Sequence, residues 1–206
     1  MKTVFIVLTI IFVLSFLFFI FYPLIKRSVL KRNFVRSYGR SVYQIANYYD
    51  YYLINTLLLK ANDDSTIDID HLLLANKFIF VIKDYYFNGS LHGKDTDNSW
   101  VYYYGRVNRP NKRFIKNPLK ENSERLRKLS LVTGLEQSLL IPVVLINDDC
   151  DLSYESKNDS DNFVIKRKDF KNLVSSIENR DVAPLKEDQL SYAVKDIAEL
   201  NLRKHK

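Results

Sequence analysis

The sequence predicts an α/β domain that follows a single apolar helix at the N-terminus. Short runs of β-branched and aromatic residues alternate with stretches whose apolar residues recur every three or four positions, as in strands and amphipathic helices. Ahead of these runs, residues 3–25 contain no charged residue. The composition is 47% hydrophobic, with 5 Gly and 5 Pro in 206 residues. It therefore excludes a disordered or fibrous protein.

The uncharged segment 3–25 is long enough to span a membrane, because a helix of this length covers about 34 Å. The apolar region of a cleaved signal peptide is normally about 7–15 residues long and ends at small residues. This segment instead runs through Tyr22 and Pro23 into Lys26 and Arg27. We therefore expect a retained transmembrane anchor rather than a signal peptide.

The next segment, residues 26–40, is basic and contains no acid. Only Lys2 and the amino terminus carry positive charge on the other side of the apolar segment, so the positive-inside rule places the rest of the chain in the cytoplasm. We expect a single-pass protein of the cell membrane with its N-terminus outside. The single cysteine, Cys150, excludes an internal disulfide and fits a reducing compartment. The basic residues of this segment are Lys26, Arg27, Lys31, Arg32, Arg36 and Arg40.

A helix from residue 41, leading into a strand over 51–59, precedes the central feature of the sequence, a predicted hairpin. Its two strands cover residues 67–74 and 78–82, and residues 75–77 form the turn. Side chains alternate between the two faces of a strand, so Asp68 and Asp70 share one face of the first strand, and Lys83 and Tyr85 share one face of the second. A carboxylate among buried aliphatic side chains needs a partner.

The rest of the chain continues the alternation of strands and helices. Residues 88–93 are rich in turn formers, and Pro142 lies inside an otherwise strand-like run. Asp169 is a candidate helix cap. In chain order we expect a strand at 100–104, a connection at 105–111, a helix after Asn117-Pro118, a buried strand at 139–146, an acidic loop at 147–161, a short strand at 163–166, a helix from 170, and a final helix with an apolar stripe at Leu190, Val194, Ile197 and Leu200.

A basic segment covers residues 109–128, where eight Lys or Arg residues outnumber Glu121 and Glu124. A patch of this kind can neutralise phosphates, whereas a solvated helix face is the alternative interpretation. We expect the segment to lie on a loop and the first turns of the following helix. The candidate nucleic-acid contacts are Lys112, Arg113, Lys116, Lys120 and Arg125.

No glycine-rich phosphate loop, metal-binding histidine pattern or serine nucleophile motif occurs in the sequence. The hairpin and the helix after it are therefore the only candidates for chemistry. Their residues resemble the nuclease-related domain, NERD, over residues 40–178. The resemblance rests on the order of several short motifs: Ile69-Asp70-His71-Leu72-Leu73-Leu74, Ile79-Phe80-Val81-Ile82, Gly89, Gly93, Trp100, Asn117-Pro118-Leu119 and Asn122.

The NERD family is similar to the restriction-endonuclease-like PD-(D/E)XK nucleases, which implies a mixed β-sheet flanked by helices with the acid-bearing strands at its centre. In those enzymes two carboxylates hold Mg²⁺ or Mn²⁺ and a lysine positions water. Asp70 matches the family's aspartate and candidate metal ligand. Lys83 replaces the second acid, Tyr85 replaces the lysine, and Glu121 replaces a helix glutamine. We therefore expect a degenerate catalytic centre in which Lys83 pairs with Asp70.

Two further residues of the hairpin face away from Asp70. Asp84 follows Lys83 directly, so its side chain lies on the opposite face and would need a β-bulge to reach Asp70. His71 also faces away, and a packed, hydrogen-bonded histidine is a more common arrangement than a general base.

The sequence thus predicts four regions: an anchor (1–25), a basic juxtamembrane segment (26–40), a NERD-like domain (41–178) and a C-terminal amphipathic helix (179–206). The first functional hypothesis is a membrane-anchored pseudoenzyme that binds DNA, RNA or another anionic partner and needs no cofactor. A divergent Mg²⁺- or Mn²⁺-dependent phosphodiesterase is the second; its catalytic residues would be Asp70 with Glu121 or Asp84, and Lys83 would contact the phosphate or the transition state. A protein-interaction module at the membrane, which presents the stripe from Leu190 to Leu200, is the third.

Overall fold

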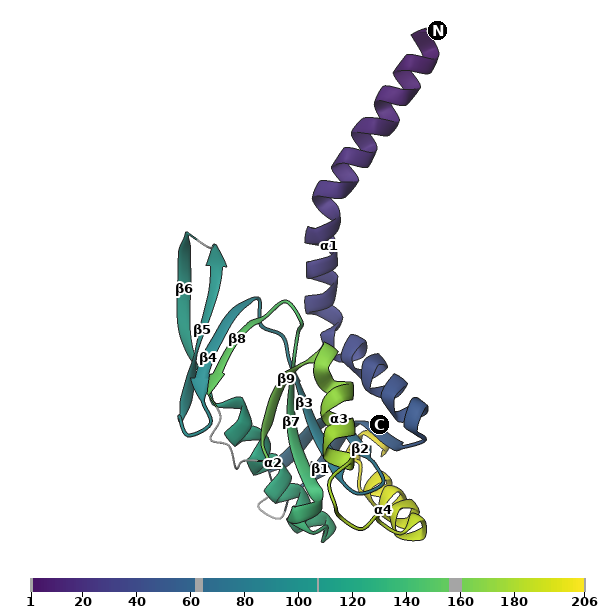
Figure 1. Ribbon diagram of the computed structural model, residues 1–206, viewed down its shortest axis with the longest axis vertical. Helices are drawn as coiled ribbons and strands as arrows, with labels where there is room; N and C mark the ends of the chain where they lie inside the picture. Colours follow the sequence, from purple (N-terminus) through teal and green to yellow (C-terminus); the bar gives the residue numbers. More distant parts are fainter. Residues whose placement is uncertain (1, 62–64, 107, 156–160, 206) are drawn as a thin grey trace. The chain divides into compact units, whose positions relative to one another are not determined.

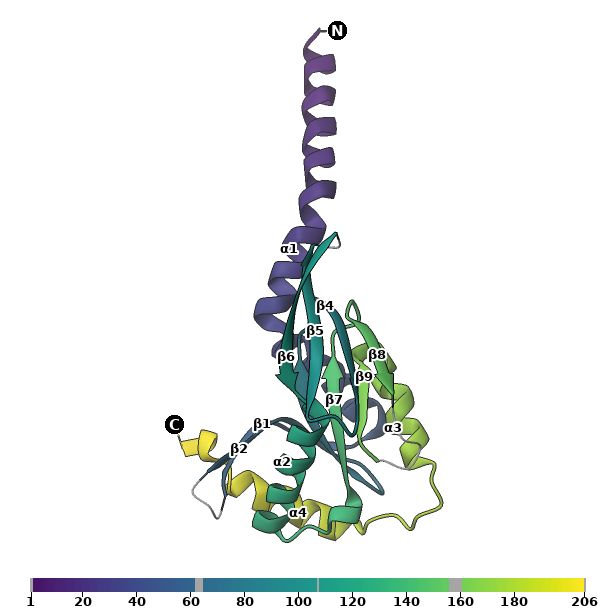
Figure 2. The same cartoon turned by 90° about the vertical axis from the view of Figure 1, so that its left-hand side faces the viewer.

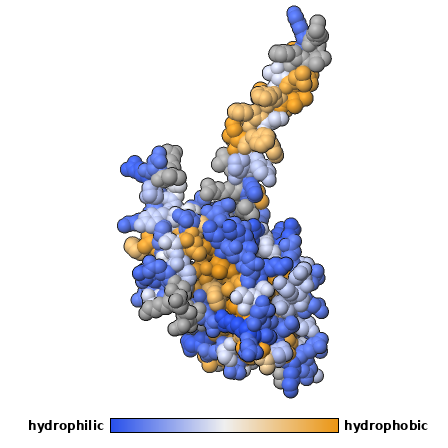
Figure 3. Space-filling view, in the orientation of Figure 1, coloured by the Kyte–Doolittle hydropathy of each residue, from blue (hydrophilic) through white to orange (hydrophobic). Residues whose placement is uncertain are grey.

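The computed structural model describes residues 2–61, 65–106, 108–155 and 161–205, and the chain divides into two compact units, residues 1–37 and 38–206. Helix α1 (Lys2–Tyr49) begins in the first unit and ends in the second (Figure 1). The backbone leaves helical geometry at Asn33, where φ is −122° and ψ is 24°. Residues 6–23 are all exposed, and the segment is long enough and apolar enough to cross a membrane (Figure 3, orange), although a signal sequence would meet the same criteria.

Within the described residues, the second unit contains two β-sheets and three further helices. The five-stranded sheet has the order β1-β2-β3-β7-β9, and the four-stranded sheet has the order β6-β5-β4-β8. The elements are β1 (Tyr52–Lys60), β2 (Thr66–Leu74), β3 (Ile79–Tyr85), β4 (Gly89–Lys94), β5 (Ser99–Arg106), β6 (Arg109–Lys116), α2 (Pro118–Thr133), β7 (Leu140–Ile146), β8 (Asp151–Glu155), β9 (Phe163–Lys166), α3 (Phe170–Glu178) and α4 (Glu187–Glu199), with 3₁₀ turns at Gln137–Leu139, Arg167–Asp169 and Leu202–His205.

The predicted hairpin is confirmed as strands β2 and β3 of the five-stranded sheet. The two strands are antiparallel, with Leu72 opposite Val81, and the turn is closed by a 2.9 Å hydrogen bond from the amide of Ala75 to the carbonyl of Phe78. β1 pairs with β2 antiparallel, whereas β7 pairs with β3 parallel and β9 with β7 parallel. The sheet is therefore mixed, and the acid-bearing strands β2 and β3 lie inside it.

Helices cover both faces of the five-stranded sheet. Figure 2 shows α2 and α4 next to the strands of this sheet. Leu126 and Leu129 of α2, together with Leu190 and Ile197 of α4, share a core with side chains of β1, β2 and β3. On the opposite face, Phe170 of α3 packs edge-on against Phe80, with ring centroids 6.4 Å apart. The end of α1 lies on the same face, because a Cβ added to Gly39 would come within 3.0 Å of the His71 ring.

The predicted α4 stripe mostly packs on the domain. Leu190 and Ile197 are buried and Val194 packs against the same core, but Leu200 is 47% exposed. The predicted cap of α3 is wrong, since the side chain of Asp169 makes no capping hydrogen bond. At α2 the predicted start is confirmed, because the side chain of Asn117 accepts hydrogen bonds from the first turn of the helix.

Three strands of the four-stranded sheet differ from the sequence interpretation. β4 and β8 lie where turns and an acidic loop were expected, and β6 begins within the expected connection. β4 contains two glycines, and Gly93 is needed there because a Cβ would lie 2.3 Å from the indole of Trp100. β6 is almost wholly exposed and strongly polar. β4 and β6 therefore lack the apolar pattern by which strands are recognised, and in β8 only Leu152 and Tyr154 alternate with polar residues.

Candidate functional site

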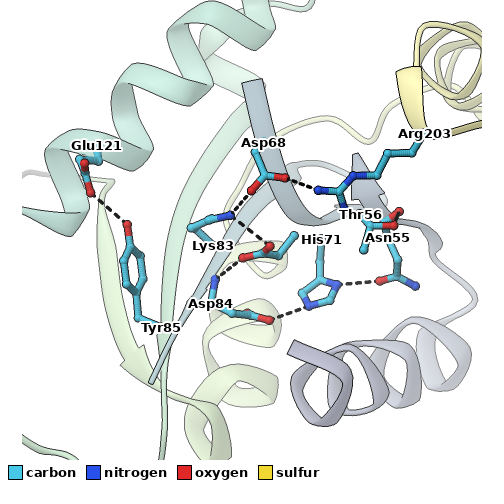
Figure 4. A network of polar contacts seen from close by, with 10 residues as sticks. Asn55, Thr56, Asp68, His71, Lys83, Asp84, Tyr85, Glu121 and Arg203 are labelled. Atoms are coloured by element: carbon cyan, nitrogen blue, oxygen red, sulfur yellow. Dashed lines mark hydrogen bonds and ion pairs between the residues drawn. The ribbon is translucent and has the colours of Figure 1, made fainter. Parts of the chain in front are cut away.

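Three charged side chains meet on the face of the hairpin that looks toward α2. Continuing the β2–β3 register by one step places Lys83 opposite Asp70, on the same face. The Lys83 ammonium lies 2.7 Å from Asp68 Oδ2 and 3.1 Å from Asp70 Oδ1 (Figure 4). Asp70 Oδ2 also accepts a 2.9 Å hydrogen bond from the amide of Asp84, and Asp68 Oδ1 accepts one of 3.0 Å from Arg203. The predicted Asp70–Lys83 pair is therefore present.

This arrangement does not fit a divalent cation. The side chains of Lys83 and Asp70 are only 14% and 12% exposed, so water screens their interaction poorly. A metal ion at Asp70 would have to displace the ammonium or lie beside it, and either change is costly in a buried site. Among the described residues, no group of three or more His, Cys, Asp or Glu side chains is placed to hold a metal.

Glu121 does not join Asp70, because it is bound elsewhere. The hydroxyl of Tyr85 donates to Glu121 Oε2 at 3.1 Å, and Figure 4 shows this pair apart from the one at Lys83. Burial raises the pKa of Tyr85 to about 12, although the nearby Arg125 opposes the shift. Tyr85 is therefore a neutral hydrogen-bond donor near pH 7. The three replacements seen in the sequence form two separate structural pairs.

The opposite face of the hairpin carries a buried His71–Asp84 pair. His71 Nε2 lies 2.9 Å from Asp84 Oδ2, and Nδ1 lies 2.6 Å from Asn55 Oδ1. Both ring nitrogens thus face oxygen atoms, and each can donate a hydrogen bond when it carries a proton. Burial raises the pKa of Asp84 to about 6, while the bond to His71 opposes the shift.

The prediction that Asp84 and His71 face away from Asp70 is confirmed. Asp84 cannot provide a second carboxylate on the Asp70 side, because its side chain is fully buried against His71. Asn55 was missed in the sequence. It lies on β1, directly opposite His71 in the strand register, so only the pairing of β1 with β2 identifies it.

The five predicted nucleic-acid contacts occupy four different environments. Lys112 and Lys116 are exposed on one face of β6. Arg113 points to the other face, where its guanidinium lies 5.3 Å from the ring centre of Tyr102. The ammonium of Lys120 binds the Thr96 carbonyl and Asn98 Oδ1, at 2.7 and 2.8 Å. Arg125 is half-buried beside Tyr85. They do not form one continuous patch.

Comparison with known proteins identifies the family. The family model of the nuclease-related domain matches residues 39–147, which are 109 of the 206 residues. The chain belongs to this family. The matched NERD region begins at Gly39, beside His71, and includes Asp70, Lys83, Tyr85 and Glu121. It indicates a nuclease-related function.

No curated protein matches the chain. Among solved structures, it is similar to the crystal structure of a protein of unknown function, AF1548, with a TM-score of 0.37 and 8% sequence identity over 78% of each chain. This likeness is too distant to assign the fold. The NERD assignment therefore rests on the family match.

Proposed function

We propose that this NERD protein is a membrane-anchored, catalytically inactive protein that binds nucleic acid. The observation that carries the proposal is the Lys83 ammonium bound between Asp68 and Asp70. A nuclease that uses Asp70 to hold a divalent metal needs a second acid there, and a buried ammonium opposes the metal's charge instead. Lys83 neutralises Asp70 in place of the metal.

The strand arrangement supports a restriction-endonuclease-like core for the NERD domain. The hairpin β2–β3 lies inside the sheet, and β7 pairs with β3 in parallel orientation. Asp70 and Lys83 stand on neighbouring strands and one face, as the metal-binding acids of such enzymes do. In this arrangement Lys83 occupies the place of the second acid and Tyr85 that of the lysine.

Charge supports an anionic partner. The chain carries a net charge of +7, and Lys112 and Lys116 project into solvent without an ion pair to any described residue. Exposed lysines that neutralise phosphates release counterions, so the resulting affinity falls as salt rises. The apolar segment 6–23 and the basic residues that follow it support a single membrane anchor with the NERD domain in the cytoplasm.

The test uses the full chain in nanodiscs of zwitterionic lipid, with DNA and RNA in the presence of Mg²⁺ or Mn²⁺. We expect binding that weakens steeply between about 50 and 200 mM salt, and no cleavage. Binding that is absent or insensitive to salt would contradict the binding function. Cleavage that disappears in Asp70→Ala would instead establish a divergent phosphodiesterase, and cleavage that persists in that variant would indicate a contaminant.

A double variant tests whether the site has the geometry of a restriction-endonuclease-like catalytic centre. Lys83→Glu combined with Tyr85→Lys rebuilds the acid and lysine of the nuclease pattern beside Asp70. We expect metal-dependent cleavage to appear in this variant if the five-stranded sheet is a restriction-endonuclease-like core. The single change Tyr85→Lys, which leaves the Lys83 ammonium in place, is the matched control and should remain inactive.

A further inference from the structure

The strand register of the four-stranded sheet separates its side chains into two faces. Phe114 on β6 lies opposite Val101 on β5, which lies opposite His92 on β4. Two residues further along each strand, Lys112 lies opposite Tyr103. All of these share one face, because directly opposite residues point the same way. The alternate residues Leu91, Trp100 and Tyr102 are buried on the other face, in a core with Phe87 and Ile146.

The first of these faces, here called the outer face, carries aromatic rings that the core does not use. Phe114 is 68% exposed, although burying a phenylalanine typically contributes about 1.5–3 kcal/mol. Tyr103 and His92 are half-exposed and pack edge to face, with ring centroids 5.4 Å apart. Phe114, which is exposed, and Tyr103, which is half-buried, are diagonal neighbours on adjacent strands. Such positions lie about 7–8 Å apart.

Charge on the outer face is divided between its two edges. Lys112 and Lys116 flank Phe114 on β6, two residues away on either side, and are exposed. On β8 the outer face carries Asp151 and Glu155, and Glu155 is paired with Lys94 at 2.6 Å. The aromatic rings therefore lie next to a positive edge. Within the described residues, neither Lys112 nor Lys116 has a carboxylate partner.

We propose that the outer face binds single-stranded nucleic acid, with bases stacked on Phe114 and Tyr103 and phosphates held by Lys112 and Lys116. This inference rests on the proposed nucleic-acid function and names its substrate class. Exposed aromatic rings on a sheet accept the faces of unpaired bases, and each stacked base contributes about 1–3 kcal/mol. The diagonal spacing of the rings suits successive bases of an extended strand.

The same geometry disfavours a duplex. In a double helix the base faces are stacked on each other, so they are not accessible to Phe114 or Tyr103, and only the lysine contacts remain. The rings and the lysines are therefore expected to have separable effects on binding. Affinity for a single strand depends on the rings, whereas the salt dependence is set by the lysines.

The experiment measures fluorescence anisotropy of labelled oligothymidylate, oligouridylate and a DNA duplex against the full chain in nanodiscs of zwitterionic lipid. We expect tighter binding of the single strands than of the duplex. Phe114→Ala should weaken single-strand binding about 5- to 160-fold, because one stacked base is lost. Its salt dependence should not change. Phe114→Trp should retain binding and show quenching of its indole fluorescence on stacking.

Two controls separate the contributions. Lys112→Gln combined with Lys116→Gln should reduce the slope of log affinity against log salt by about 1.4, since each phosphate contact to a single strand contributes about 0.7. Leu131→Ala removes an exposed apolar side chain on α2, 60% exposed, and should leave binding unchanged.

If the wild-type chain binds nucleic acid but Phe114→Ala binds single strands equally well, the stacking inference is wrong while the proposed function stands. Equal affinity for duplex and single strands would also overturn the inference. A wild-type chain that binds neither would refute both. Loss in Phe114→Ala of binding to anionic lipid vesicles, without any single-strand binding by the wild type, would assign the outer face to a membrane surface instead.

Discussion

Lys83 determines the electrostatic character of the hairpin's α2-facing side. Its ammonium binds the carboxylates of Asp68 and Asp70. Asp68 has a second cationic partner, Arg203, whereas Lys83 is the cation bound to Asp70. A buried carboxylate that loses its cation is costly, whereas an intact buried pair contributes little compared with apolar residues of the same size. The pair is therefore better evidence about function than about stability.

This dependence predicts the effect of Lys83→Met. The variant leaves Asp70 buried without a cation, so the free energy of unfolding should fall by about 3 kcal/mol. Urea denaturation of the full chain in detergent micelles measures it. Lys116→Met, at an exposed position on β6, should change stability by less than about 0.5 kcal/mol. Adding Asp70→Asn to Lys83→Met should recover part of the loss; no recovery would argue against an unpaired charge as its cause.

The His71–Asp84 pair predicts a pH dependence of stability. The pKa of Asp84 rises from an ordinary value of 3.8 to about 6 in the folded chain. Between these values the folded state binds more protons than the unfolded state, so the contribution is present below pH 4 and is lost as the pH rises through 6.

Asp84→Asn removes this titration, while an amide can still donate to His71 Nε2. From pH 4 to pH 7 the stability of Asp84→Asn relative to the wild type should rise, by at most about 3 kcal/mol. Urea denaturation over this pH range measures the difference. The exposed Asp151→Asn should show no comparable trend. A parallel pH profile for Asp84→Asn and the wild type would refute the assignment.

At the scale of elements, the sequence revealed those whose burial leaves a pattern. β2 and β3 each contain a short apolar run and β7 is apolar throughout, so their residues alone identified them. β4, β6 and β8 were missed because they are rich in glycine or in exposed, charged residues. Their strand structure depends on hydrogen bonds to neighbouring strands, which the local sequence does not reveal. The resemblance to the nuclease pattern, which puts Lys83 in place of the second acid, predicted the Asp70–Lys83 pair. Arg203 could not be predicted, since it lies 135 positions along the chain from Asp68.

The start of α2 depends on both ends of the Asn117 amide. Asn117 Oδ1 accepts from the amides of Leu119 and Lys120, at 2.9 and 3.4 Å. Nδ2 donates to the carbonyls of Lys94, Asp95 and Asp97 in the β4–β5 turn. The buried side chain of Asn117 therefore links the β4–β5 turn of the four-stranded sheet to α2, which packs on the five-stranded sheet.

This double role predicts an unusual response to Asn117→Asp. Aspartate is normally as good a helix cap as asparagine. Here it would place a carboxylate oxygen against three carbonyl oxygens, so Asn117→Asp should destabilise the fold at least as much as Asn117→Ala, by about 2 kcal/mol or more. Thermal or urea denaturation gives the comparison. Asp188→Asn, an exposed change in the first turn of α4, is the control. If Asn117→Asp is as stable as the wild type, the turn contacts are ruled out as a source of stability.

At the scale of the whole molecule, the distribution of charge predicts a membrane topology. The apolar segment 6–23 is followed by six basic residues and no acid before residue 41, whereas only Lys2 and the amino terminus precede it. Basic residues close to a spanning helix remain on the cytoplasmic side. The side of the membrane on which residues 38–206 lie therefore tests the anchor and its orientation. Whether these residues stay with the membrane tests whether the anchor is retained.

In sealed, right-side-out membrane vesicles, external protease should leave the NERD domain intact until detergent opens the membrane. Replacing the basic residues between positions 26 and 36 by glutamine, and adding lysines before Thr3, should expose the domain to the protease, because the charge bias is reversed. The same number of glutamine changes at exposed lysines of the NERD domain should leave the protection unchanged. Release of the domain into the soluble fraction would indicate a cleaved signal sequence, and digestion of the wild type without detergent would indicate the opposite orientation.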